Sequence, residues 1–459
     1  MIRGKPTTVR ILTLGCAKNT VDSEVMNGLL SADGCRVVTG GRADVAVVNT
    51  CGFIRDAKEE SIGEILALAR AKEKGRIRRL VVAGCMATRY RDDLPELLPE
   101  VDLFIGPGDL PALPGLIRKL LEGEAPRTHV SGAALPDEAY ERRVPGEGRA
   151  SAFVKILEGC DNRCSYCTIP AIRGPLQSRA RESVLAEIRI LVRKGAREIN
   201  LVGQDITSYG ADRGEKGGLV PLVRDICKIG GVRWVRLLYL YPGRIDDSLI
   251  DLLGAEKKIC RYLDIPVQHI DPGILSMMGR RYGPDDVHAL VRRLRERLPG
   301  VFLRTSLIVG FPGETARAFD RLLRFVHDTR WDYLGVFPYS REDGTAAFAM
   351  TRQVPDRLKR ERAQRIQDVQ ADILAARNTA MAGEEVEVLV EKTFARGRAV
   401  GRHKGQAPEV DGNVVLSGYA SRAGRFCRAR ITGAREWDLF AKTVPAKPVD
   451  TGASAGILT

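Results

Sequence analysis

Residues 152–167 read AFVKILEGCDNRCSYC, an apolar strand-like run that leads directly into a loop with three cysteines. Further strand-like runs follow this loop, with helical segments such as 184–194 and 285–297 between them. Strands that alternate with helices are typical of a parallel sheet, and six such units predict a partial parallel (β/α) barrel. The predicted strands are 152–157, 198–202, 234–239, 262–265, 302–309 and 333–336.

The three cysteines of this loop are Cys160, Cys164 and Cys167. Loops at the carboxyl ends of barrel strands carry active sites, and thiolates are the usual ligands of iron–sulfur clusters. Three ligands leave one iron of a 4Fe–4S cluster open for a substrate or cofactor. Structural zinc is the alternative, but zinc prefers four ligands, and the nearest further one, His129, is distant in sequence. The spacing therefore favours a cluster.

Three more cysteines follow strand-like runs near the N-terminus, at 9–14, 44–49 and 80–83. Helical segments separate these runs, which predicts a second parallel sheet. The carboxyl ends of parallel strands meet at one edge, so we expect Cys16, Cys51 and Cys85 to lie close together. A lone cysteine is more often a small buried hydrophobe. We expect that role for the other four, which are Cys35, Cys227, Cys260 and Cys427.

The pattern changes again from Glu384, where short strand-like stretches alternate with glycine turns, as in a small OB-like β-barrel. The fold class is therefore α/β with a small β domain. The expected boundaries are 1–127 for the first domain, 128–150 for a linker, 151–382 for the barrel domain, 383–443 for the β domain and 444–459 for a disordered tail.

The chain has 459 residues and a net charge of +14, with a pI near 9.4. Such a charge favours nucleic acid or a nucleoprotein as partner, without requiring one. No stretch approaches the length of about 18 apolar residues that a membrane span needs, and the N-terminus lacks the apolar part of a secretory signal. We therefore expect a cytoplasmic protein without a membrane partner, in which clustered thiols indicate metal chemistry rather than disulfides.

The sequence around these cysteines resembles the radical S-adenosylmethionine (SAM) methylthiotransferase family, and within it the RimO branch. The resemblance covers about residues 8–443 and includes a C-terminal TRAM domain. One departure is Asp161-Asn162, where the family more often has Asn-His. The matching segments are LGCAKNTVDSE (14–24), NTCGFI (49–54), AGCMA (83–87), EGCDNRCSYCTIPAIRGPLQSR (158–179), LVGQDITSYG (201–210), YLDIPVQH (262–269), LRTSLIVGFPGET (303–315), FPYSREDGT (337–345) and APEVDG (407–412).

The resemblance implies two 4Fe–4S clusters and two molecules of SAM. The cluster on Cys160, Cys164 and Cys167 would cleave SAM to a 5′-deoxyadenosyl radical, and an auxiliary cluster on Cys16, Cys51 and Cys85 would hold or donate sulfur. No catalytic residue is expected beyond these ligands. The candidates for contacts with SAM are Tyr166, Gln204, Asp205, Ser306 and, more weakly, Arg179. For Gln204, Asp205 and Ser306 a role in turns or caps remains the alternative, and for Arg179 a solvated surface position.

The RimO branch implies methylthiolation of the β-carbon of an aspartate in small-subunit ribosomal protein S-twelve. A reductant protein such as flavodoxin or ferredoxin would supply electrons. The sibling branch modifies a tRNA adenosine, so tRNA is the partner under that alternative. A third hypothesis is a non-catalytic RNA- or ribosome-binding factor whose cysteines hold structural zinc.

Overall fold

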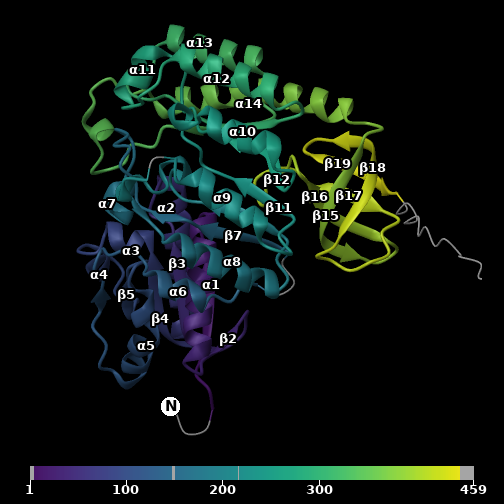
Figure 1. Cartoon of the computed structure of the whole chain (residues 1–459). Helices are drawn as coiled ribbons and strands as arrows, with labels where there is room; N and C mark the ends of the chain where they lie inside the picture. The colour runs from purple at the N-terminus through teal and green to yellow at the C-terminus, as the bar shows by residue number, and fades with distance from the viewer. Residues whose placement is uncertain (1–4, 147–149, 216, 445–459) are drawn as a thin grey trace, which may run out of the picture. The chain divides into compact units, whose positions relative to one another are not determined.

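The computed structural model describes residues 5–146, 150–215 and 217–444. The predicted tail therefore lies, after Val444, outside the described residues. The chain divides into two compact units, residues 1–373 and 374–459. The first unit holds two parallel sheets of six strands each, and the second is a closed β-barrel (Figure 1). The predicted fold class is confirmed.

The first sheet has the strand order β2-β1-β3-β4-β5-β6, and its strands are all parallel. Its central strands are almost continuously buried, as expected for strands of a parallel sheet. The strands are β1 (Thr8–Thr13), β2 (Arg36–Val38), β3 (Ala43–Thr50), β4 (Ile77–Gly84), β5 (Leu103–Ile105) and β6 (Thr128–His129). The helices are α1 (Ala17–Ala32), α2 (Arg55–Glu73), α3 (Cys85–Arg89), α4 (Leu94–Leu97) and α5 (Leu113–Glu122).

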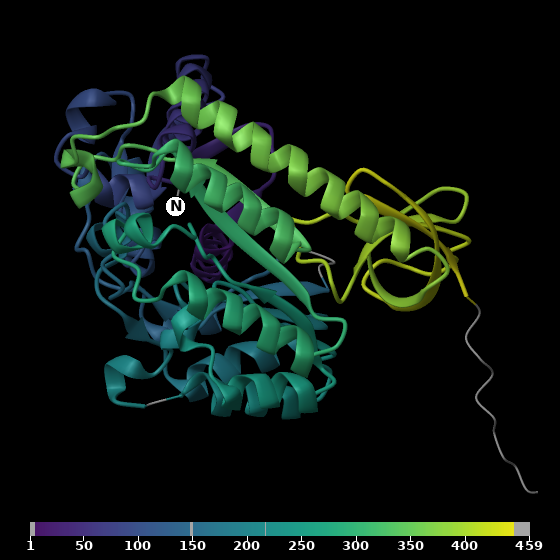
Figure 2. The same ribbon diagram turned by 90° about the horizontal axis from the view of Figure 1, so that it is seen from above.

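The second sheet has the order β14-β13-β12-β11-β10-β7 and is also parallel. Its two outer strands do not pair, so the barrel is open (Figure 2). The strands are β7 (Ser151–Lys155), β10 (Glu198–Val202), β11 (Trp234–Leu237), β12 (Ile259–Asp264), β13 (Phe302–Val309) and β14 (Tyr333–Pro338). The helices are α8 (Arg181–Arg193), α9 (Leu219–Lys228), α10 (Asp247–Ala255), α11 (Pro272–Met277), α12 (Pro284–Arg297), α13 (Ala316–Thr329) and α14 (Asp356–Ala380).

The segment 128–150, expected as a linker, carries structure of its own. Its first two residues form β6 at the edge of the first sheet, and Asp137–Glu141 forms the short helix α6. Three further short elements lie around the cysteine loop of the second sheet. They are the two-stranded pair β8 (Leu157–Glu158) and β9 (Gln177–Ser178), and the helix α7 (Ile169–Arg173).

The barrel of the second unit closes in the order β15-β16-β17-β19-β18. Its core is formed by the inward-facing residues that alternate along its strands, such as Val388, Val414 and Leu439. Strand β19 did not stand out in the sequence, because only Leu439 and Ala441 of its six residues are buried. The strands are β15 (Glu385–Phe394), β16 (Arg398–His403), β17 (Val414–Ser417), β18 (Phe426–Arg435) and β19 (Asp438–Thr443).

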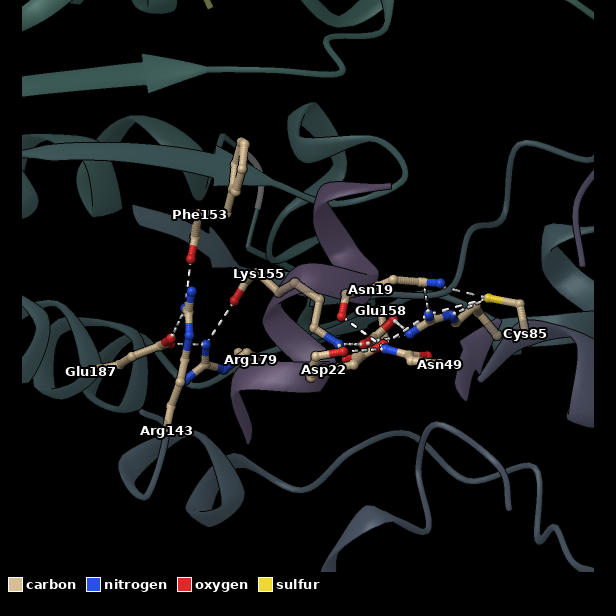
Figure 3. A network of polar contacts seen from close by, with 12 residues as sticks. Asn19, Asp22, Asn49, Cys85, Arg143, Phe153, Lys155, Glu158, Arg179 and Glu187 are labelled. Carbon is tan, nitrogen blue, oxygen red and sulfur yellow. Dashed lines mark hydrogen bonds and ion pairs between the residues drawn. The ribbon is translucent and has the colours of Figure 1, made fainter. Parts of the chain in front are cut away.

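The two sheets of the first unit are joined by a buried network of four charges (Figure 3). Helix α1 lies against β7, and Lys155 of β7 forms ion pairs with Asp22 of α1 and with Glu158. Arg173, at the end of α7, pairs with the same two carboxylates, at 2.9 Å from Asp22 and 3.3 Å from Glu158. Two cations face two anions, so the network is neutral although it is buried.

A second buried group of ion pairs continues from the first (Figure 3). Arg143 binds Glu24 of α1 and Glu187 of α8, and its Nη1 also donates to the main-chain oxygen of Phe153, at 2.6 Å. Arg179 binds the same Glu187. Segments from α1, the 128–150 stretch, β7 and α8 are thereby fixed to one another through charges that are removed from water.

We predict that Lys155→Met lowers the stability of the first unit by about 3–5 kcal/mol, because it leaves Asp22 and Glu158 buried with one cation fewer. Urea unfolding followed by the fluorescence of the buried Trp234 and Trp331 measures the effect. The exposed Lys119→Met is the control and should change stability by no more than about 0.5 kcal/mol. Equal midpoints for both variants would contradict a role of the network in joining the sheets.

Candidate active site

The first three candidate cysteines lie at the carboxyl ends of three neighbouring strands, β1, β3 and β4. Cys16 precedes α1, Cys51 directly follows β3, and Cys85 begins α3 after β4. The strands are in parallel register, with Thr13 opposite Asn49. This placement agrees with the sequence prediction that the cysteines meet at one edge of the sheet.

Two glycines allow this close approach. Gly15 has a φ of +91°, and a Cβ on it would lie 2.9 Å from the Cβ of Cys51. Gly84 has a φ of +96°, and a Cβ there would lie 2.4 Å from the side-chain oxygen of Asn49. Both backbone conformations are costly for other residues. The glycines before Cys16 and Cys85 therefore allow the turns that bring the thiols together.

The thiols of this first set influence one another electrostatically. Burial, together with the neighbouring Cys85 and Cys16, raises the pKa of Cys51 to about 11. Burial also raises the pKa of Cys85. Burial opposes ionisation of Cys16 as well, but Lys18 and Arg173 outweigh it and lower its pKa. A bound metal would stabilise all three thiolates and release their protons.

Arg173 contacts this first set directly. Its Nη2 and Nε lie 3.2 and 3.4 Å from the sulfur of Cys85. Nη2 also lies 3.2 Å from the side-chain oxygen of Asn19, whose amide group donates to the main-chain oxygen of Thr50. Because Arg173 ends α7, which begins two residues after Cys167, one short helix connects the two cysteine sets.

The second set, Cys160, Cys164 and Cys167, lies in the loop between β8 and α7. Burial raises the pKa of Cys160, and it raises that of Cys167 to about 12, with Cys164 and Cys160 contributing. Arg280 lies 3.5 Å from the sulfur of Cys164 and the same distance from the hydroxyl of Tyr166. Each set thus has one arginine that donates to one sulfur.

The departure at Asp161-Asn162 has a structural role in this loop. Asp161 accepts a hydrogen bond from the main-chain nitrogen of Leu176, at 3.1 Å. The amide of Asn162 donates to Asp205 at 2.9 Å, and its oxygen accepts from Arg244 at 2.9 Å. Both side chains therefore fix the cysteine loop to its surroundings.

The candidate SAM contacts from strand ends fall in different environments. Asp205 is buried and already accepts from Thr207, Ser208 and Asn162, in addition to its ion pair with Arg244. The side-chain oxygen of Gln204 is buried without a hydrogen-bond partner, which leaves an acceptor available beside the loop.

Two further candidates lie on the second sheet and its cysteine loop. Ser306 shares the half-exposed face of β13 with Arg304 and Ile308. Tyr166 packs edge-on against Phe311, with ring centroids 6.5 Å apart.

Arg179 is placed differently from the solvated surface position that was the alternative for it. It is only 4% exposed, its guanidinium lies 3.6 Å from the centroid of the Tyr140 ring, and it binds Glu187 and Asp137. Its Nη2 donates to Ser183. These contacts assign Arg179 to the buried ion pairs that join the sheets, and its donors are already used.

The other four cysteines differ in burial. Cys227 and Cys260 are buried, as expected, whereas Cys35 and Cys427 are only half-buried. All ten cysteines are free of disulfides. Across the described ranges, no three His, Cys, Asp or Glu side chains converge closely enough to hold a single metal ion. An iron–sulfur cluster has a different requirement, because each thiolate binds its own iron.

Sequence reasoning did not identify three cations near the cysteines, namely Lys18, Arg173 and Arg280. Lys18 follows Cys16 by two residues, and its Nζ lies 3.5 Å from the main-chain oxygen of Gly203 at the carboxyl edge of the second sheet. Proximity in sequence could have indicated Lys18 and Arg173. Arg280 could not be found in this way, since it is 116 residues from Cys164.

Family models match three parts of the chain. Residues 8–106 match the uncharacterized protein family UPF0004, residues 154–326 match the radical SAM superfamily, and residues 382–444 match the TRAM domain. A solved structure, the radical SAM methyltransferase TsrM from Kitasatospora setae, superposes with a TM-score of 0.55 at 18% identity and covers 75% of this chain and 77% of its own. That likeness concerns the fold. None of the helices in the described residues is long and apolar enough to cross a membrane.

Curated relatives match nearly the whole chain. "Ribosomal protein uS12 methylthiotransferase RimO" from Syntrophotalea carbinolica is 45% identical over 95% of this chain and 96% of its own length. The protein of the same name from Geobacter sulfurreducens is 44% identical, with coverages of 95% and 98%. SAM and 4Fe–4S clusters are the cofactors of such enzymes, and this protein is an enzyme that transfers sulfur-containing groups. The chain belongs to the RimO family of radical SAM methylthiotransferases.

Proposed function

We propose that this protein replaces a C–H bond on the β-carbon of an aspartate in ribosomal protein S-twelve by a methylthio group, using two SAM molecules and two 4Fe–4S clusters. The observation that carries the proposal is the pair of three-cysteine sets at the carboxyl edges of two parallel sheets. The names of the relatives supply the substrate.

Cys160, Cys164 and Cys167 would hold the cluster that cleaves SAM, and Cys16, Cys51 and Cys85 would hold the auxiliary cluster. The donor sets fit such groups, because all six thiols are free and each set has an arginine on one sulfur. When bound, the clusters supply one-electron chemistry and an open iron for sulfur, which amino-acid side chains cannot provide.

The surrounding residues bind and orient. Gln204, Ser306 and Tyr166 would contact SAM, with Gln204 offering its unpaired acceptor. Asp205 would act mainly by fixing Asn162, and with it the cysteine loop. The β-barrel of residues 383–443 would bind the substrate protein. Its exposed aromatic side chains, Phe394, Trp437 and Phe440, are suited to such contacts.

The substrate and the charge suggest the cellular setting. A ribosomal-protein substrate places the enzyme in the cytoplasm, with a reduced flavodoxin or ferredoxin as electron donor. The basic pI near 9.4 is compatible with a ribosomal surface and also with tRNA, the substrate of the sibling branch.

The cysteine assignments predict the iron content of variants. Cys164→Ala and Cys51→Ala should each reduce iron from about eight to about four atoms per chain, because each removes one ligand of one cluster. Iron analysis and electron paramagnetic resonance (EPR) after anaerobic reconstitution measure this. Cys227→Ala, in a buried position outside both sets, should retain all iron. Equal iron in Cys51→Ala and Cys227→Ala would contradict the auxiliary cluster.

The contacts of Arg173 and Arg280 predict that each arginine affects the reduction potential of one cluster only. Hydrogen bonds to cluster sulfurs raise the potential. Arg173→Lys should make the auxiliary cluster harder to reduce by about tenfold in the ratio of reduced to oxidised form, which is about 59 mV, and leave the other cluster unchanged. Arg280→Lys should make the cluster on Cys160, Cys164 and Cys167 harder to reduce and leave the auxiliary cluster unchanged. EPR-monitored redox titration separates the two, and a shift of both clusters by either variant would contradict the assignment.

The substrate is tested in a host that lacks its own methylthiotransferases, with and without this gene. Mass spectrometry should find a methylthio group on one aspartate of ribosomal protein S-twelve and unchanged tRNA nucleosides. Methylthioadenosine in tRNA with an unmodified ribosomal protein would move the chain to the sibling reaction. Absence of both modifications, with iron-loaded enzyme present, would reject methylthiotransfer to either substrate.

A further inference from the structure

Lys18 extends from the carboxyl edge of the first sheet to that of the second. It lies in the first turn of α1, two residues after Cys16. Its Nζ is 3.5 Å from the main-chain oxygen of Gly203, which follows β10, and 3.8 Å from the centroid of the Tyr239 ring, which follows β11. The ammonium group is therefore placed between the thiols of the first set and the carboxyl edge of the second sheet.

This ammonium group differs from the other cations around it. Arg173, Lys155 and Arg143 each bind carboxylates in the buried networks. Within the described part of the chain, no carboxylate lies within 4.0 Å of the Lys18 nitrogen. An ammonium group has three donors, and a carbonyl oxygen and a ring face do not satisfy them all. The anionic groups nearest to Lys18 are the thiols of the first cysteine set, which a bound metal would occupy. A half-buried cation with unused donors and no carboxylate partner is costly, so the position favours an external carboxylate.

The support beneath Lys18 is rigid. Tyr239 has a φ of +64°, which is rare for a residue with a side chain and is maintained only by its surroundings. Its main-chain nitrogen donates to Asp264 at 3.1 Å, and its main-chain oxygen accepts from Ile206 at 3.1 Å. Asp264 in turn binds Arg304 of β13. The main chain that carries this ring is thus held by β12, through Asp264 by β13, and by the segment that follows β10.

The proposed substrate offers an anion of suitable chemistry. The target β-carbon of an aspartate is bonded directly to the carboxylate carbon. A cation that binds the carboxylate therefore fixes the position of the β-carbon. Contacts farther along the substrate chain restrict that position less. We propose that Lys18 binds the side-chain carboxylate of the target aspartate and positions its β-carbon between the two cysteine sets. This inference rests on the proposed function.

The test is a double-mutant cycle between Lys18 and the target carboxylate. The dissociation constant and the KM of iron-loaded enzyme are measured with ribosomal protein S-twelve, either unchanged or with the modified aspartate replaced by asparagine. Lys18→Met should weaken binding of the unchanged protein by about 10- to 100-fold, as expected for loss of a charge-assisted hydrogen bond. It should leave the already weaker binding of the asparagine variant unaltered.

Two further variants complete the experiment. Lys18→Arg retains the charge and should recover part of the affinity. Lys74→Met removes an exposed lysine at the end of α2 and should behave like the wild type. Equal losses for both substrates with Lys18→Met, or no loss at all, would overturn the proposal. A loss of iron in Lys18→Met would also overturn it, since it would assign Lys18 to the cluster site.

The outcomes separate this inference from the proposed function. If the wild type does not modify ribosomal protein S-twelve, the proposed function fails. If the wild type modifies it and Lys18→Met binds and modifies it equally well, only the assignment of Lys18 fails.

Discussion

The neutral group of Asp22, Lys155, Glu158 and Arg173 is the interaction on which the arrangement of the first unit depends. Each charge is almost completely removed from water, so each requires its partners to be present. Asp22 belongs to the first sheet's helix, whereas the other three belong to the second sheet and its cysteine loop. The charges can be satisfied together only when the two carboxyl edges face each other. Packing of apolar surfaces alone would specify that geometry less strictly.

The same network also connects the two cysteine sets through shared hydrogen bonds. Glu158 lies two residues before Cys160, and it is held by Arg173, which also donates to the sulfur of Cys85. Burial opposes ionisation of Glu158, but Lys155 and Arg173 lower its pKa to about 2. A displacement of one set would therefore disturb the hydrogen bonds of the other. The separation of the two sets is fixed by these buried contacts rather than by a flexible connection.

The sequence predicts much of the fold and the six candidate thiols, because strand periodicity and cysteine spacing are local signals. Strands 198–202 and 302–309 coincide with β10 and β13. Strand β19 was missed, since only two inward-facing positions, Leu439 and Ala441, contribute to its pattern. Arg179 is buried because it binds Glu187 and packs on the ring of Tyr140. Neither contact can be recognised from the sequence around Arg179. The position of Lys18 relative to Gly203 and Tyr239 depends on how the sheets meet, which no local pattern encodes.

The contact between Arg173 and Cys85 has a consequence for the biosynthesis of the chain. The two residues are 88 positions apart, and a ribosome synthesises Cys16, Cys51 and Cys85 well before Arg173. In the nascent chain the first sheet can form while Asp22 and the Cys85 sulfur still lack their arginine. Arg173 emerges only six residues after Cys167. The polar surroundings of the first thiol set are therefore complete only after the second set has been synthesised.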